Sequence, residues 1–152
     1  MLSDADATLL AVAQGLELAA RDIYASALSR GSKTGDELAL IELIYGHHVD
    51  YEQALNGVLS KKAVTTRDEV VFTKFSAMLA DTNKTWSTLL ELENMAVSTH
   101  IVLIEKIESA KRAALLGSIV MVEARHAAML ASLISNNLSL ALDNSTQALG
   151  IP

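Results

Sequence analysis

The chain has 152 residues, of which 51% are hydrophobic and only 4% aromatic, and its formal net charge is −6 at pH 7. It contains no cysteine, which excludes disulfides, thiolate metal sites, cysteine nucleophiles and iron–sulfur ligation. The acidic balance favours attraction of cations and gives no reason to expect nucleic acid or an anionic membrane as a partner. The only proline is the last residue, and Ala and Leu dominate, so the composition predicts one all-α domain.

Four long helices and one short helix are predicted in chain order. Ser3 or Asp4 caps a first helix that runs to about residue 29, with Gly31 just past its end. A second helix covers about 36–60, and 61–65 form the next connection. Residues 66–69 are a candidate capping box that opens a short helix to about residue 80.

The third long helix ends at about residue 109, and the fourth covers about 111–135. Residues 136–152 form a weaker helix or a tail. We therefore expect a single domain over 1–152, with its core at about 4–135. Four long helices with a long crossover between helices two and three match an antiparallel four-helix bundle.

Each long helix carries a row of positions spaced by three and four residues, as the core of a bundle requires. The rows are Leu10, Ala13, Glu17, Ala20, Tyr24 and Ala27; Leu38, Ile41, Tyr45, His48, Glu52, Leu55 and Leu59; Trp86, Leu89, Glu93, Ala96, His100, Leu103 and Ile107; and Leu116, Ile119, Glu123, His126, Leu130 and Leu133.

The rows are apolar at both ends and polar in the middle, where Glu17, His48, Glu93, Glu123 and His126 lie. A carboxylate buried alone costs several kcal/mol, so such groups occur paired or bound to metal. Carboxylates supply charge and neutral imidazoles supply nitrogen donors, so these five side chains are the predicted metal ligands. A buried hydrogen-bond network of Glu and His without metal is the alternative interpretation.

The residues also resemble a known ligand pattern. Glu on helices one and three, with Glu-x-x-His on helices two and four, is the pattern of ferritin-like di-iron and di-manganese proteins. The segments 122–128, 16–20 with Tyr24, and 92–93 are similar to helices four, one and three of a bacterial ferritin-like domain family. The resemblance covers about residues 5–135. It implies a ferritin-like bundle in which Glu17 and His48 serve one metal, Glu93 and His126 serve the other, and Glu123 bridges them.

Two positions depart from the family pattern. Tyr45 stands where the family has a bridging glutamate, which leaves three carboxylates for two divalent ions. Tyr45 itself or Glu52, one turn past His48, could supply the missing metal ligand. His100 stands where the family usually has an aromatic hydroxyl, and it is either an extra ligand or a partner of one. Tyr24 is interpreted as a hydrogen-bond donor to the ligands.

The resemblance implies iron, two ions if the site is intact, with manganese or zinc as other candidates. Di-iron or iron–manganese redox chemistry, in which Fe(II) is oxidised by dioxygen or peroxide, is the first functional hypothesis. The alternatives are a single-metal structural site and a non-enzymatic interaction or stress-related module with a degenerate site. We expect a homo-oligomer, a dimer or larger. The start of the chain lacks signal-peptide features and no uninterrupted apolar run is long enough to span a membrane, which fits a cytoplasmic protein, although a processed exported form fits as well.

Overall fold

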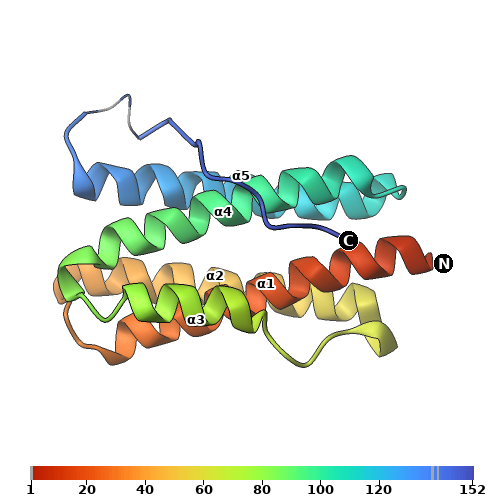
Figure 1. The fold of residues 1–152 in the computed structure, drawn as a ribbon, viewed down its shortest axis with the longest axis horizontal. Coiled ribbons are helices and arrows are strands. Elements are labelled where there is room, and N and C mark those ends of the chain that lie inside the picture. The colour runs from red at the N-terminus through yellow and green to blue at the C-terminus, as the bar shows by residue number, and fades with distance from the viewer. Residues whose placement is uncertain (1, 138, 140) are drawn as a thin grey trace. The chain divides into compact units, whose positions relative to one another are not determined.

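The computed structural model describes residues 2–137, 139 and 141–152, and in this part of the chain every regular element is a helix. The four long helices are α1 (Asp4–Ser29), α2 (Gly35–Leu59), α4 (Thr85–Lys106) and α5 (Ala110–Ile134). The short helix α3 (Glu69–Met78) lies in the connection between α2 and α4, and single 3₁₀ turns occupy Ser60–Lys62 and Thr82–Lys84. The predicted all-α fold, with a short helix in the long crossover, is confirmed (Figure 1).

Local sequence signals explain several helix ends. The Ser3 hydroxyl accepts a hydrogen bond from the Asp6 amide at 3.1 Å, so Ser3 caps α1. Gly31 follows the end of α1 with a φ of 61°, the left-handed conformation that favours glycine. The predicted capping box at 66–69 is wrong, because the N-cap of α3 is Asp68, whose carboxylate accepts from the Val71 amide at 3.0 Å. Asp68 lies three residues before its partner, the usual geometry of an acidic N-cap.

The chain folds as two compact units, one of residues 14–85 and one of residues 1–13 with 86–152. The first unit contains most of α1, followed by α2 and α3. Its connection from α2 to α3 is anchored on α1, because the Asp68 amide donates to the Gly15 carbonyl at 2.9 Å and the Val64 amide donates to the Gln14 side chain at 2.8 Å. This anchoring fixes the crossover beside the middle of α1.

Arg67, in the connection between α2 and α3, forms ion pairs with α1 and α3. Its guanidinium donates to Asp22 at 2.8 Å and to Glu69 at 2.9 Å, and it lies 3.3 Å from the centre of the Phe72 ring. Burial alone lowers the pKa of Arg67, but the hydrogen bonds and charges of Asp22 and Glu69 raise it overall. Arg67 therefore stays charged and joins α1 to α3.

In the second unit, α4 and α5 form an antiparallel pair joined by the short link 107–109 (Figure 1). Asp6, from the first turn of α1, is buried, and its carboxylate accepts from the amides of Glu108 at 2.9 Å and Ser109 at 3.3 Å. A carboxylate at this position satisfies amides at the start of α5 and complements the helix dipole. Asp6 therefore sets where α5 begins.

The predicted core rows agree with burial at most positions. All six residues of the α1 row are buried, including Glu17 and Tyr24. In α2, Ile44 is buried and Tyr45 is only half-buried, so the row passes through Ile44 rather than Tyr45. Leu133 is 40% exposed, because the interior face of α5 ends with Leu130 and Ala131.

The helix α5 is also long and apolar enough to cross a membrane, by length and composition alone. Its most apolar window has a mean hydropathy of 1.4, and a third of that window is buried. The core helix of a folded domain passes the same test. The interior face of α5 carries Glu123 and His126 near its middle, and both are buried.

Candidate metal centre

In the unit of residues 14–85, Glu17 of α1 and His48 of α2 form a buried pair. The His48 Nδ1 atom lies 2.8 Å from Glu17 Oε2, and both side chains are fully buried. Glu17 follows Ala13 and precedes Ala20, so small side chains flank it along the helix face. An ionised Glu17 carboxylate only accepts hydrogen bonds, so it pairs with the tautomer of His48 that carries a proton on Nδ1.

Aromatic rings hold the imidazole of His48 in place. The Tyr24 ring lies 5.2 Å from it, centroid to centroid, tilted by 30°. The Tyr51 ring approaches it edge-on at 5.9 Å. His47 is half-buried, and its ring stacks on the Tyr51 ring with the two centroids 6.2 Å apart. The ring orientation of His48 is therefore fixed by packing as well as by Glu17, which is the kind of preorganisation that a metal ligand requires.

The unit that contains α4 and α5 holds two such pairs. His126 Nδ1 lies 3.2 Å from Glu93 Oε2, and His100 Nδ1 lies 2.9 Å from Glu123 Oε2. Each helix contributes one glutamate and one histidine. Glu93 and His100 are two turns apart on one face of α4, and Glu123 and His126 are one turn apart on one face of α5. All four side chains are buried.

These distances fit metal ligands as well as hydrogen bonds. Two donor atoms bound to one ion at about 2.1 Å and at right angles lie about 3.0 Å apart. The separations in the Glu17–His48 and Glu93–His126 pairs, 2.8 Å and 3.2 Å, lie on either side of this value. The donor chemistry also fits, since carboxylate oxygen and imidazole nitrogen suit iron, manganese and zinc. The structure thus contains buried glutamate and histidine side chains that could hold a metal ion.

Tyr24, Glu52 and Tyr45, the additional residues predicted near the ligands, differ in their burial and contacts. Tyr24 is fully buried against His48. Glu52 is half-buried, and its Oε1 atom accepts a hydrogen bond from Gln14 Nε2 at 3.0 Å. Tyr45 is half-buried, whereas the predicted ligand three residues later, His48, is fully buried.

Sequence reasoning missed Gln14. This side chain is fully buried in the unit of residues 14–85, and its two ends serve different partners. Its Nε2 atom donates to Glu52, and its Oε1 atom accepts from the Val64 amide. Gln14 lies three residues before Glu17, so helical spacing alone could have placed it beside the polar middle of α1. Its role is to connect α2 and the crossover to α1.

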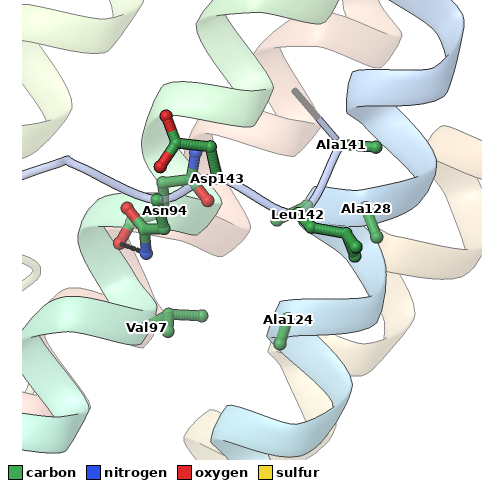
Figure 2. Close-up of a pocket in the computed structure, with 9 residues that line it drawn as sticks. Asn94, Val97, Ala124, Ala128, Ala141, Leu142 and Asp143 are labelled. Carbon is green, nitrogen blue, oxygen red and sulfur yellow. Dashed lines mark hydrogen bonds between the residues drawn. The ribbon is translucent and has the colours of Figure 1, made fainter. Parts of the chain in front are cut away.

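A separate cavity of about 170 Å³ lies in the unit that contains α4 and α5 (Figure 2). Asn94 and Val97 of α4 line it, with Ala124, Ala127 and Ala128 of α5. Residues 141–144 of the C-terminal segment close one side. None of the predicted metal ligands lines this cavity, and its lining holds no histidine.

The C-terminal segment is held against α4 by hydrogen bonds. The Asn144 side chain donates to the Asn94 carbonyl at 3.2 Å, the Ser98 hydroxyl donates to the Thr146 carbonyl at 2.8 Å, and the Leu149 amide donates to the Thr99 hydroxyl at 3.0 Å. In its described residues this segment is irregular.

Comparison with known proteins gives one match. A family model described as "Ferritin-like domain" matches residues 5–136, a range that covers all five helices except the first residue of α1. No curated protein and no solved structure matches the chain. The matched range agrees closely with residues 5–135, over which the sequence resembles a ferritin-like domain family, and it includes all the predicted ligands.

Proposed function

Because the chain belongs to the ferritin-like domain family, we propose that it binds metal ions through Glu17, His48, Glu93, Glu123 and His126. The observation that carries the proposal is the burial of two glutamate–histidine pairs, Glu17–His48 and Glu93–His126, each formed between consecutive long helices of one unit. Burying such groups opposes folding unless they gain strong partners, and a bound cation is the strongest partner available to carboxylates.

The types of ligand atom restrict which metal ions the site can prefer. Oxygen-only sites suit Mg²⁺ and Ca²⁺, whereas a mixed set of carboxylates and imidazoles suits first-row transition metals. Iron, manganese and zinc are therefore the candidates, and we place iron first. Bound iron would supply one-electron chemistry between Fe(II) and Fe(III), with dioxygen or peroxide as the oxidant. The protein's part is to hold the ion with these side chains and to exclude bulk water from their buried surroundings.

Charge limits how many ions each unit can hold. In the unit of residues 14–85 Glu17 supplies one negative charge, and in the other unit Glu93 and Glu123 supply two, which balance one divalent ion. An ion in the unit of residues 14–85 thus depends on a further negative group or an exogenous anion. Glu52 is the nearest carboxylate along the α2 row, but it would have to exchange its hydrogen bond with Gln14 for the metal. We expect two ions of unequal affinity, the weaker one dependent on Glu52 or Tyr45.

The proposal is tested by metal-dependent thermal stabilisation. A ligand at about 100 times its Kd stabilises the native state by about 2.7 kcal/mol, and for a domain of this size each kcal/mol raises the Tm by about 2–4 °C. We expect Fe(II) under anaerobic conditions, Mn(II) and Zn(II) to raise the Tm of the wild type by roughly 5–11 °C. Glu123→Gln, which keeps the side-chain shape, should remove most of this rise. An equal rise in both proteins would refute the ligand assignment.

The redox part of the proposal has its own test. Air oxidation of stoichiometric Fe(II) is followed by absorbance and by oxygen consumption, with Glu93→Gln as the comparison. Faster oxidation by the wild type than by the variant and by buffer supports an oxidoreductase of ferroxidase type. Tight binding of one ion per chain with no oxygen consumption supports instead a structural site, which the carboxylate count favours as the second candidate.

A further inference from the structure

His100 is a fully buried histidine that the five-residue ligand set does not use. It lies on α4, two turns after Glu93, and its Nδ1 atom is 2.9 Å from Oε2 of Glu123 on α5. Both residues belong to the same unit, and the contact joins two helices through completely buried atoms. A charge-assisted hydrogen bond in such surroundings is stronger than one at the surface and more costly to break.

The contact restricts how Glu123 can act. An ionised Glu123 carboxylate only accepts hydrogen bonds, so it pairs with the tautomer of His100 that carries a proton on Nδ1. Oε2 is directed towards His100, so the plane of the carboxylate and the direction of its other oxygen, Oε1, are set by this bond. Carboxylates that ligate metals are commonly held by such outer hydrogen bonds, which reduce the rotational freedom lost on binding.

The same helical position serves a similar purpose in the other unit. Tyr24 follows Glu17 by seven residues, as His100 follows Glu93. The Tyr24 ring packs on His48, which is the predicted ligand on the partner helix α2. In each unit, therefore, the residue two turns after the first glutamate contacts a predicted ligand on the neighbouring helix. One contact is a ring packing and the other is a hydrogen bond to a carboxylate.

We propose that His100 is a positioning residue that holds Glu123 in its metal-binding orientation through the Nδ1 hydrogen bond, without ligating the metal itself. The inference rests on the proposed function, because it assumes that Glu123 binds metal. It predicts that only the hydrogen-bond donor at the Nδ1 position matters. An outer hydrogen-bond partner of a ligand typically contributes roughly 10–100-fold in metal affinity, so removing this donor should weaken binding by that factor.

Three substitutions separate the roles that His100 can have. The amide nitrogen of His100→Asn lies where Nδ1 lies, so this variant keeps a donor to Glu123. The amide of His100→Gln lies where Nε2 lies, and His100→Leu has no donor at all. Glu105→Gln, a substitution at an exposed position of α4, is the control. Circular dichroism and Tm first establish that each variant folds, and His100→Gln, which stays polar, replaces His100→Leu if the latter does not.

Mn(II) alone is the probe, with free and bound ion measured by electron paramagnetic resonance and nitrogen coordination by electron spin echo modulation. We expect His100→Asn and Glu105→Gln to bind close to wild type with unchanged nitrogen modulation. His100→Gln and His100→Leu should bind roughly 10–100-fold more weakly. If His100→Asn is weakened as much as His100→Leu and loses nitrogen modulation, His100 is a ligand and the positioning role is overturned. Unchanged affinity in every variant overturns it as well. A wild type that binds neither Mn(II), Fe(II) nor Zn(II) overturns the proposed function itself.

Discussion

Asp6→Ala tests how the start of α5 is fixed. The carboxylate of Asp6 is 2% exposed and accepts from two amides, at 2.9 Å from Glu108 and 3.3 Å from Ser109. Ser109, the N-cap residue of α5, makes no side-chain cap hydrogen bond of its own. Asp6 therefore replaces the local cap, and its removal leaves amides near the helix start without their acceptor.

The expected cost follows from the two bonds. A hydrogen bond to a charged group contributes about 1.5–3 kcal/mol, and loss of an N-cap costs about 0.5–2 kcal/mol. The shorter bond, from the Glu108 amide at 2.9 Å, should contribute as a hydrogen bond to a charged group does. The longer bond, from the Ser109 amide at 3.3 Å, should contribute less, as an N-cap does. Arg112, 3.8 Å from Asp6, adds little. We expect Asp6→Ala to lower the free energy of unfolding by about 2–4 kcal/mol, and the Tm by roughly 5–15 °C.

Urea and thermal unfolding followed by circular dichroism measure the effect. Asp6→Asn keeps one acceptor oxygen and should lose about half as much stability as Asp6→Ala. Asp50→Ala, at an exposed position on α2, should stay within about 0.5 kcal/mol of wild type. Metal stoichiometry should be unchanged in Asp6→Ala at temperatures where it is folded. A loss below about 0.5 kcal/mol for Asp6→Ala, or equal losses for Asp6→Ala and Asp6→Asn, would refute this role.

Three further substitutions test the supporting contacts. Gln14→Leu leaves the Val64 amide and the Glu52 carboxylate without their shared partner, so urea unfolding should show a loss of about 1–3 kcal/mol; wild-type stability would contradict the bridging role. Arg67→Lys loses the forked contact with Asp22 and Glu69, and because Arg67 is partly exposed the loss should be about 1 kcal/mol or less and should shrink in high salt. Thr99→Val removes the acceptor for the Leu149 amide, so limited proteolysis of the C-terminal segment should accelerate, and an unchanged cleavage rate would show that this bond does not hold the segment.

The sequence carries most of the information about the helices because their signals are local. The three- and four-residue spacing predicted all six buried positions of the α1 row, and Gly31 marked the end of that helix. Errors arose where two neighbouring residues were equally good candidates. Of Ile44 and Tyr45 in α2, Ile44 is the buried one, and Asp68, two residues after Thr66, is the actual cap of α3. Periodicity alone does not decide between adjacent positions.

Spacing selected the glutamates and histidines of the candidate site, whereas their pairing, Glu17 with His48 and Glu93 with His126, came from the family resemblance. Sequence spacing placed the glutamates and histidines at one level of the helices, but nothing in it distinguishes His126 from His100 as the partner of Glu93. That choice depends on the register of α4 against α5. The roles of Gln14 and Asp6 were out of reach for a similar reason, since their partners lie 38 to 103 residues away along the chain.

The central claim is that this ferritin-like chain binds metal through buried glutamate and histidine side chains. The most direct test is the metal content per chain, measured by inductively coupled plasma mass spectrometry on protein purified without chelators and again after anaerobic reconstitution with Fe(II). The comparison is a Glu17→Gln, Glu93→Gln, Glu123→Gln variant, with folding checked by circular dichroism. We predict at least one tightly bound transition-metal ion per wild-type chain and none in the folded variant. Equal metal contents in the two proteins, or a wild type that stays without metal after reconstitution, would contradict the claim.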